Sequence, residues 1–370
     1  GIIGAGKVVQ RAYLPGFSPR GSKNSKTEFS WYDYGGCDNG RVVVLCGKNV
    51  DEAREYADKF GVPKVCENWR EVVEDAGVDA VCVATPNYLH SEMSIAAANA
   101  GKDVLVEKPI AITLREADAM IEAAEKNNVL LMVNHTFRFL PAVDISLRIV
   151  RSGVLGRIVS VKSKFGTPGP DLWAPGSDWF FSRDEAGYGT LLDVGIHAVD
   201  LVRYLSGKRV SDVAGFGGTF SKNIELDDNS VCIFRFEDET LGIIEASWTS
   251  VLDISVVVSG DKGLLEINLC RDKPVRLELS SGRFEERKEA GDNNMEIAGI
   301  KGMSVEGSFY PDIPSETEYR GPFQHFIDCI LDKRKMPISS GKEGRDTLEV
   351  VLAGYKSIRE SKFITLPLKE

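Results

Sequence analysis

The sequence lacks the marks of a membrane, secreted or nucleic-acid-binding protein. No apolar run reaches about 18 residues, the length that a membrane-spanning helix needs. We also expect no secretory leader. The formal net charge is −10, so the chain has no basic footprint for phosphate backbones. We therefore expect a cytoplasmic protein whose partners are small molecules, with no nucleic acid and no membrane among them.

The signatures of disulfide, metal, phosphate-loop and serine-hydrolase chemistry are also missing. The seven cysteines are odd in number and form no C-x-x-C pair, so we expect reduced thiols. The four histidines show no H-x-H or H-x-x-x-H spacing, so we expect no metal site. Neither G-x-x-x-x-G-K-[ST] nor G-x-S-x-G occurs.

The length of 370 residues exceeds the roughly 250–300 at which single cores stop growing, so we expect two domains. In the first third, apolar strands alternate with amphipathic helices, the pattern of a parallel sheet covered on both faces. The strands are expected at 1–3, 42–45, 80–84, 104–106 and 129–133, and the helices at 7–14, 50–60, from 68 onward, 89–98 and 113–126. We assign residues 1–133 to a Rossmann domain, a doubly wound parallel sheet that binds a dinucleotide.

Local signals set the expected ends of several elements in this domain. Capping boxes are expected where Asn68 precedes Glu71 and where Thr113 precedes Glu116. Gly61 ends one helix, and the Pro15–Gly16 pair ends another, before a long polar loop at 18–40. Because the chain opens inside a strand, we expect a few natural residues to precede it.

The rest of the chain follows a different pattern. Strands joined by tight turns indicate an antiparallel or mixed sheet, and helices are interspersed among them. The strands are expected at 158–165, 212–220, 230–236, 241–248, 254–258 and 264–269, and the helices at 141–151, 190–205, 322–332 and 344–361. We assign residues 134–370 to an α+β domain, the second of the two.

The first functional signal is a glycine turn between a strand and a helix. Gly4 and Gly6 permit a tight turn and close approach of a ligand to the backbone. The helix then begins at Lys7 and Val8, whose free N–H groups and positive dipole end suit a pyrophosphate. Val9 stands where the fingerprint has a third small residue. The pattern favours a dinucleotide site, and the alternative is a plain structural turn.

The end of the second strand bears on the choice of cofactor. NAD enzymes usually place an acidic residue there for the ribose hydroxyls, but this chain has Cys46-Gly47-Lys48-Asn49. A carboxylate would repel a 2′-phosphate, whereas Lys48 would attract one. We therefore expect NADP rather than NAD, the alternative being a solvated loop lysine.

Two further motifs follow strands whose carboxyl ends are expected to face the ligand crevice. Thr85, Asn87 and His90 follow the strand at 80–84, and Glu107 and Lys108 follow the strand at 104–106. We count all five as cofactor-binding candidates. A loop followed by a helix cap is the alternative for the first motif.

Lys108, Asp193 and His197 are the catalytic candidates. Near a positively charged nicotinamide an ammonium group releases its proton more readily, which suits proton transfer by Lys108. Asp193 and His197 are four residues apart, so on one helix they share a face, and the carboxylate orients the imidazole. A solvated lysine and a structural Asp–His pair are the alternatives.

Together these motifs resemble the glucose–fructose oxidoreductase/inositol dehydrogenase/MocA family. The motifs that carry the resemblance are 1–6, 85–90, 107–109 and 189–200, and their order and spacing cover essentially the whole chain. The resemblance implies a Rossmann domain followed by an open, mainly antiparallel mixed sheet that commonly serves oligomer contacts. It also implies bound NAD or NADP, a sugar or polyol substrate, a homo-oligomer such as a dimer or tetramer, and a Lys–Pro bond at 108–109 that is often cis.

The resemblance also places substrate residues. Lys108 matches the lysine of the family's E-K-P motif, and Asp193 and His197 match its D-x-G-x-H pair. Asn134 and Arg138 lie in a segment similar to one that faces the family's active site. Trp179 and Arg183 precede the catalytic helix and are further substrate candidates, with core or hinge packing as the alternative.

These residues predict an oxidoreductase that moves a hydride between nicotinamide and a hydroxyl or carbonyl carbon of a sugar, polyol or sugar derivative. His197 takes the hydroxyl proton, Lys108 stabilises the developing alkoxide, and Asp193 orients His197 or the substrate. Which of Lys108 and His197 accepts the proton stays open. The alternatives are a glycosidase that oxidises the sugar transiently with bound NAD, and a non-catalytic nucleotide sensor.

Overall fold

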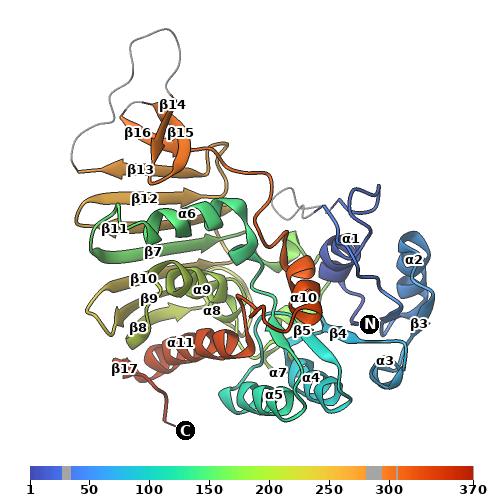
Figure 1. The fold of residues 1–370 in the computed structure, drawn as a ribbon. Helices are drawn as coiled ribbons and strands as arrows, with labels where there is room; N and C mark the ends of the chain where they lie inside the picture. Colours follow the sequence, from blue (N-terminus) through green and yellow to red (C-terminus); the bar gives the residue numbers. More distant parts are fainter. Residues whose placement is uncertain (27–34, 281–293, 306, 370) are drawn as a thin grey trace. The chain divides into compact units, whose positions relative to one another are not determined.

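The computed structural model describes residues 1–26, 35–280, 294–305 and 307–369 (Figure 1). The chain forms two compact units, each assembled from three segments of sequence. The first unit contains Gly1–Phe139, Pro170–Gly189 and Glu318–Leu348, and the second contains Leu140–Gly169, Thr190–Thr317 and Glu349–Glu370. Among the described residues, no helix has the length and apolar character required to span a bilayer.

The first unit is built on a six-stranded parallel sheet with the strand order β3-β2-β1-β4-β5-β6. This is the doubly wound order in which β1 and β4 flank the switch point where dinucleotides bind, and it confirms the predicted Rossmann fold. The strands are β1 Ile2–Ile3, β2 Val44–Cys46, β3 Lys64–Cys66, β4 Ala80–Val83, β5 Asp103–Val106 and β6 Leu131–Val133. The sequence prediction missed β3, because this short edge strand is partly exposed and has no apolar run.

Helices flank this sheet (Figure 1). The longer ones are α2 Val50–Phe60, α3 Trp69–Glu74, α4 His90–Asn99, α5 Leu114–Lys126 and α10 Pro322–Leu331. The short ones are the π-helix η1 Val9–Tyr13, α1 Leu14–Gly16, η3 Asn87–Leu89, η4 Thr136–Phe139, η5 Pro170–Leu172, η6 Asp178–Phe181 and α7 Arg183–Ala186. The capping box of Thr113 and Glu116 and the stop at Gly61 are confirmed.

In this unit one further predicted helix end is confirmed, and one predicted capping box is wrong. The first helix ends at Gly16, as the Pro15–Gly16 pair predicts, and Pro15 stands in the first turn of α1, where a missing N–H group costs no hydrogen bond. Asn68 does not form a capping box with Glu71; its side chain accepts a hydrogen bond from the backbone amide of Arg70 instead.

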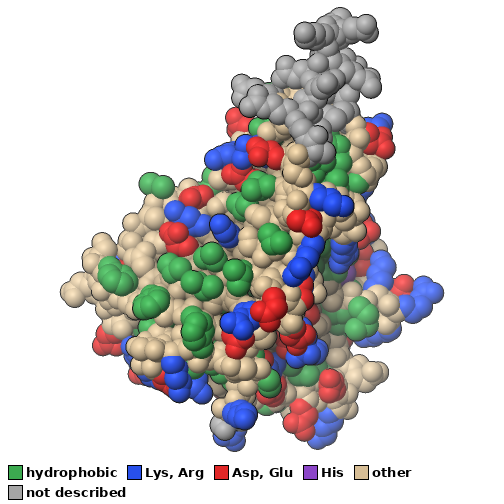
Figure 2. Space-filling model, turned by 90° about the vertical axis from the view of Figure 1, so that its left-hand side faces the viewer, with side chains coloured by type: hydrophobic (Ala, Val, Ile, Leu, Met, Phe, Trp, Pro, Cys, Tyr) green, Lys and Arg blue, Asp and Glu red, His purple; other side chains and the backbone are tan. Residues whose placement is uncertain are grey.

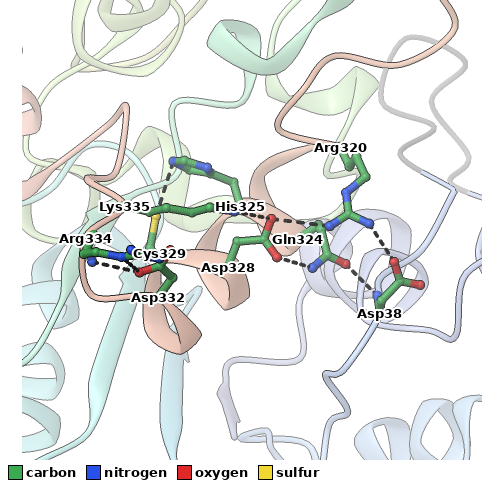
Figure 3. Close-up of polar contacts among 9 residues, drawn as sticks. All are labelled: Asp38, Arg320, Gln324, His325, Asp328, Cys329, Asp332, Arg334 and Lys335. Carbon is green, nitrogen blue, oxygen red and sulfur yellow. Dashed lines mark hydrogen bonds and ion pairs between the residues drawn. The ribbon is translucent and has the colours of Figure 1, made fainter.

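A polar network fastens the loop that follows the first helix to α10 (Figure 3). The carboxylate of Asp38 accepts a hydrogen bond from Arg320 at 2.8 Å, and the Asp38 amide donates to Gln324 Oε1 at 2.6 Å. Gln324 Nε2 donates to Asp328 at 2.7 Å, and the Gln324 side chain is 1% exposed. Of the loop predicted at 18–40, residues 27–34 lie outside the described residues.

The same helix carries a histidine and a cysteine that pack as a structural pair (Figure 3). His325 Nε2 accepts a hydrogen bond from the Ile338 amide at 3.1 Å and lies 3.6 Å from the Cys329 thiol. Burial lowers the pKa of His325 to about 4 and raises the pKa of Cys329 to about 11. Both groups are therefore neutral near pH 7, as burial on the inner face of α10 requires.

Replacing Gln324 with alanine is expected to lower the free energy of unfolding by about 1–3 kcal/mol, because the Asp38 amide loses the buried side chain that accepts its hydrogen bond. Urea denaturation followed by circular dichroism measures the change. Arg334→Ala is the control, since it breaks an ion pair with Asp332 at the surface, and we expect it to leave the transition midpoint unchanged. Equal midpoints for wild type and Gln324→Ala would refute the structural role of the network.

The second unit is built on an eleven-stranded sheet with the order β14-β15-β16-β13-β12-β11-β7-β10-β9-β8-β17. Among the neighbouring strands in the described part of the chain, only β7 and β10 are parallel, which confirms an open, mainly antiparallel mixed sheet. The strands are β7 Ile158–Gly166, β8 Val210–Gly218, β9 Asn229–Phe236, β10 Leu241–Ser247, β11 Asp253–Gly260, β12 Gly263–Asn268, β13 Val275–Leu279, β14 Asn294–Ile297, β15 Ile300–Val305, β16 Ser308–Pro311 and β17 Ile364–Thr365. The sequence prediction missed β13 to β17.

Helices cover one face of this sheet. They are α6 Pro141–Arg151, α8 Thr190–Asp193, α9 Gly195–Ser206 and α11 Gly341–Glu360, and the boundary between the two units falls within α11. Helix α9 contacts β7, β10 and β11, and α6 contacts β12 (Figure 1). The predicted single helix at 190–205 is wrong: the chain forms two helices that meet at Val194.

Candidate functional site

The glycine turn after β1 has the geometry of a phosphate-binding turn. Gly4 has φ +112°, and a side chain there would overlap the carbonyl oxygen of Ala84. A side chain at Gly6 would meet no atom of the described chain within 4 Å, so packing does not require this glycine, but a closely bound ligand would. The amides of Val9 and Gln10 donate to the Gly6 carbonyl at 3.0 and 3.1 Å, which opens the helix there. Lys7 and Val8 therefore lie in the first turn, where amides have no partner one turn earlier.

Val9 stands at the third small position of the glycine fingerprint, and its packing explains why a larger residue occurs there. Val9 is fully buried and belongs to the hydrophobic core beneath the turn, with Ile2 and Leu45. The Val9 side chain therefore points into the core. Gly6 and the exposed Val8 remain on the side of the turn where a phosphate is expected.

The turn after β2 lies beside the glycine turn. A side chain at Gly47 would come within 2.7 Å of the Ala5 side chain, so glycine is required by the close approach of the two turns. Lys48 is exposed, and Asn49 caps α2 through a hydrogen bond from the Glu52 amide. The structure thus places Lys48 at the carboxyl end of β2, where the adenosine ribose of a dinucleotide binds in this fold.

His90 ties together the turns that follow β4 and β5. Its ring is fully buried, with Nδ1 2.7 Å from the Pro109 carbonyl oxygen and Nε2 3.0 Å from the Thr85 carbonyl oxygen. Burial lowers the pKa of this imidazole. Both ring nitrogens face the backbone, so His90 supports the turns that carry Thr85 and Lys108.

The side chains of Asn87 and Thr85 differ in their hydrogen bonding. Asn87 Nδ2 donates to the Ala186 carbonyl at 2.9 Å, which fastens η3 to α7. The Thr85 hydroxyl is buried and has no hydrogen-bond partner within the described part of the chain. A buried polar atom of this kind usually has a partner, so Thr85 fits a role in ligand binding.

A hydrogen-bonded cluster positions the segment that contains Lys108. Glu107 Oε1 accepts hydrogen bonds from the Tyr13 hydroxyl at 2.8 Å and from Asn134 Nδ2 at 2.7 Å, and Oε2 accepts one from the Lys108 amide at 3.2 Å. Burial raises the pKa of Glu107, while the charge of Lys108 and these hydrogen bonds oppose that rise. The Lys108–Pro109 peptide is cis, as the resemblance implies. The cluster joins η1, β5 and β6 around the end of β5.

Asp193 and His197 lie in the second unit. Asp193 ends α8, is mostly buried, and accepts a hydrogen bond from the Trp248 indole at 3.1 Å. The His197 ring stacks on Phe165 with centroids 5.7 Å apart. Because the helix is interrupted at Val194, Asp193 and His197 lie on two different helices and do not share the face of one helix as predicted. Lys108 belongs to the first unit, so its convergence with this pair stays a prediction.

The four substrate candidates all lie in the first unit and have different surroundings. Arg138 is 2% exposed and donates to the Ile338 carbonyl and to Glu343, so its guanidinium supports the start of α11. Asn134 belongs to the Glu107 cluster, and its Oδ1 is buried with no hydrogen-bond partner among the described residues. Trp179 stacks on Phe180 at 3.8 Å, and Arg183 is exposed at the start of α7.

Two residues of the site were not found by sequence reasoning. Tyr13 ends the short helix η1, and no spacing links it to Glu107, which is 94 positions away. Trp248 follows β10 and meets Asp193 only because α8 packs against that strand. Nothing in the local sequence signals either contact.

A parallel sheet of this order with a glycine turn after β1 is the architecture of dinucleotide-binding proteins of the Rossmann class. Residues 1–135 match the model of an oxidoreductase family with an NAD-binding Rossmann fold, and residues 147–266 match the C-terminal domain of the same family. The chain belongs to this GFO/IDH/MocA oxidoreductase family, as the resemblance predicted, and it is therefore an NAD-binding oxidoreductase.

Curated relatives span most of the chain. Levoglucosan dehydrogenase of Pseudarthrobacter phenanthrenivorans is 31% identical over 272 residues, which are 66% of this chain and 69% of that protein. scyllo-Inositol 2-dehydrogenase (NAD(+)) of Bacillus subtilis is 28% identical over 89% of this chain and 90% of its own length. Among solved structures, aldose–aldose oxidoreductase of Caulobacter crescentus, complexed with glycerol, has a TM-score of 0.77 at 26% identity and covers 99% of this chain and 98% of its own.

Proposed function

We propose that the protein is a dehydrogenase of sugars, polyols or sugar derivatives that uses a nicotinamide dinucleotide. The observation that carries the proposal is the placement of Lys108 at the carboxyl end of β5, held there by the Glu107 cluster. The names of the relatives support the substrate class, since levoglucosan and inositol both carry secondary hydroxyl groups.

In the proposed mechanism two side chains act on one substrate oxygen. His197 takes the proton of the hydroxyl group, and Lys108 donates a hydrogen bond to the same oxygen and stabilises its developing negative charge. Asp193, held by Trp248, orients His197 or the substrate. The dinucleotide, when bound, supplies the hydride acceptor at its nicotinamide carbon. In the reverse direction His197 returns the proton to a carbonyl oxygen.

The assignment of residues to the cofactor also belongs to the proposal. Gly4, Gly6, Lys7 and Val8 would hold the pyrophosphate, while Thr85, Asn87, His90, Glu107 and Lys108 form or support the turns beside the nicotinamide. Asn134, Arg138, Trp179 and Arg183 are retained as substrate candidates. For Arg138 and His90 the structure supports an indirect role, through the segments that they fasten.

The proposed function is tested by identifying the cofactor and then the substrate. Mass spectrometry of the native protein identifies any dinucleotide that co-purifies. A screen of polyols and sugars then follows the absorbance of reduced nicotinamide. We expect reduction of added cofactor with at least one secondary alcohol of this class. Release of sugar from a glycoside without net formation of reduced nicotinamide would instead support the transient-oxidation glycosidase.

We further propose that the protein prefers NADP to NAD, because Lys48 is exposed at the end of β2 and the turn 46–49 has no carboxylate. Lys48→Ala is expected to raise the Kd for NADPH about tenfold and to leave the Kd for NADH unchanged, since one charge-assisted contact to the 2′-phosphate is worth about 1.4 kcal/mol or more. Fluorescence titration measures both constants. Lys59→Ala, an exposed lysine on α2, is the control. Tighter binding of NADH than of NADPH by the wild type would contradict the preference.

We also propose a homo-oligomer that forms through the face of the large sheet opposite its helices. Along β9 the side chains alternate, so that Phe234 is buried while Val231 and Ile233 are exposed. Phe216 pairs with Val231 in the sheet register and is 84% exposed, and hydrophobic side chains gather on the surface seen in Figure 2. An exposed apolar face of this kind commonly marks a protein interface.

Ile233→Arg is expected to convert a dimer or tetramer into monomer, because the charge would be buried without a partner at the interface. Light scattering coupled to size-exclusion chromatography measures the mass. Leu331→Arg, at an exposed apolar position on α10, is the control and should leave the mass unchanged. A wild-type monomer would contradict the proposal.

We also propose that the protein lies in the cytoplasm, because all seven cysteines are free thiols.

A further inference from the structure

Two neighbouring strands of the Rossmann sheet end in cysteines that face each other. Cys46 ends β2 and Cys66 ends β3, and the two are register partners in the parallel pair. Side chains of paired residues in adjacent strands project from the same face of a sheet. The two thiols lie close enough for each to perturb the pKa of the other. The Cys46 thiol donates a hydrogen bond to the Glu67 carbonyl at 3.3 Å.

The pair is accessible from one side. β3 is the edge strand of its sheet, and Cys66 is half-buried, whereas Cys46 is only 3% exposed. A reagent in solution would therefore meet Cys66 first. The Cys46 thiol then lies beside the bound reagent, so that the second reaction is intramolecular and favoured by proximity.

The distance between the two strands favours a bridge between the thiols over a direct disulfide bond. Adjacent strands lie about 4.8 Å apart, whereas a disulfide holds the two Cβ atoms about 3.8 Å apart. A direct S–S bond would therefore draw the strands together. A bridge with one atom between the two sulfurs is longer and spans the pair without that movement.

The protonation and number of the thiols exclude a simple metal site. Burial raises the pKa of both thiols, so both are protonated near pH 7. A structural metal ion needs deprotonated thiols and usually four ligands. In the described ranges of the chain no group of three or more His, Cys, Asp or Glu side chains is arranged to hold a metal ion. A reagent that needs only two neutral thiols fits better.

We propose that Cys46 and Cys66 form a dithiol site that binds a monosubstituted trivalent arsenical. The hydrated arsenical, R–As(OH)₂, condenses with both thiols. Two As–O bonds break and two As–S bonds form, and the thiol protons leave in two molecules of water. Arsenic remains trivalent, so no oxidant or reductant takes part. The product is a cyclic dithioarsenite that closes the ends of β2 and β3.

The bridge would lie at the base of the turn that carries Lys48. The Gly47 amide follows Cys46 directly and donates to the Cys66 carbonyl at 3.1 Å. The inference stands independently of the proposed dehydrogenase activity, because binding is read from mass and from thiol protection, without cofactor or substrate.

The test is titration of the full-length protein with phenylarsine oxide, followed by intact mass spectrometry. We expect one equivalent per chain, with Cys46 and Cys66 both protected from N-ethylmaleimide in the peptide map. Ethanedithiol should release the arsenical, whereas an equal concentration of 2-mercaptoethanol should not. No bound equivalent, or protection of other cysteines in place of this pair, would overturn the proposal.

Serine variants complete the test. Cys66→Ser is expected to weaken binding at least 100-fold, whereas Cys270→Ser, which removes an exposed cysteine of the second unit, should still bind one equivalent. Binding by Cys66→Ser that matches the wild type would contradict the site. The peptide map of the wild-type protein keeps the inference testable if a variant does not fold.

Discussion

Replacing Lys108 with alanine is expected to lower kcat by about 10²–10⁴-fold and to leave the Kd for the dinucleotide within about twofold of the wild type. A positioned acid–base group contributes rate enhancement of this size. Lys108 is expected to act on the reacting oxygen, whereas the pyrophosphate is held by the glycine turn after β1. Stopped-flow kinetics and fluorescence titration measure the two quantities on the substrate found in the screen.

The matched control for Lys108 is Lys126→Ala, an exposed lysine at the end of α5 in the same unit. It should keep full activity. Near-normal turnover by Lys108→Ala would refute the catalytic assignment. Dinucleotide binding without turnover in the wild type, on every polyol and sugar tried, would support the nucleotide sensor instead.

Replacing His197 with alanine is expected to lower kcat by a similar factor of about 10²–10⁴, because the hydroxyl proton then has no general base. The pH profile is the second readout. A limb of the kcat/KM profile that reports His197 in the wild type should disappear in the variant. Circular dichroism and thermal melting check that the loss of stacking on Phe165 leaves the fold intact. An unchanged rate and profile would show that His197 is structural.

The double variant tests whether the two residues act together. If Lys108 and His197 contact the same oxygen, the second substitution adds little to the first, because groups that act as a unit have strongly non-additive effects. We expect Lys108→Ala/His197→Ala to lose no more than about tenfold beyond the slower single variant. Losses that multiply in full would mean that the two side chains act at separate points.

Much of the first unit could be predicted because its signals are local. The apolar runs of β4 and β5 and the capping box of Thr113 are readable without knowledge of the rest of the chain. The same is true of the glycine turn, since only glycine tolerates φ +112° at Gly4. The edge strand β3 was missed, because a half-exposed strand of three residues has no apolar run to reveal it.

The sequence indicated candidate reacting residues but not the side chains that hold them in place. Motif order and spacing pointed to Lys108, Asp193 and His197, and their catalytic roles remain proposals. The partners that hold them are distant in sequence: Tyr13 and Asn134 reach Glu107, and the Trp248 indole reaches Asp193. Each contact depends on which strands and helices are neighbours, and no local pattern encodes that.

The sequence by itself determined the class of protein, because alternating apolar strands, a glycine turn and the order of the motifs are properties of the chain that need no partner in space. Only the tertiary structure decided what the polar side chains do. It showed Arg138 bonded to Glu343, His90 facing two backbone carbonyls, and Cys46 beside Cys66. The physical reason is that hydrogen bonding and burial depend on groups brought together from distant positions, whereas strand and turn preferences are set within a few residues.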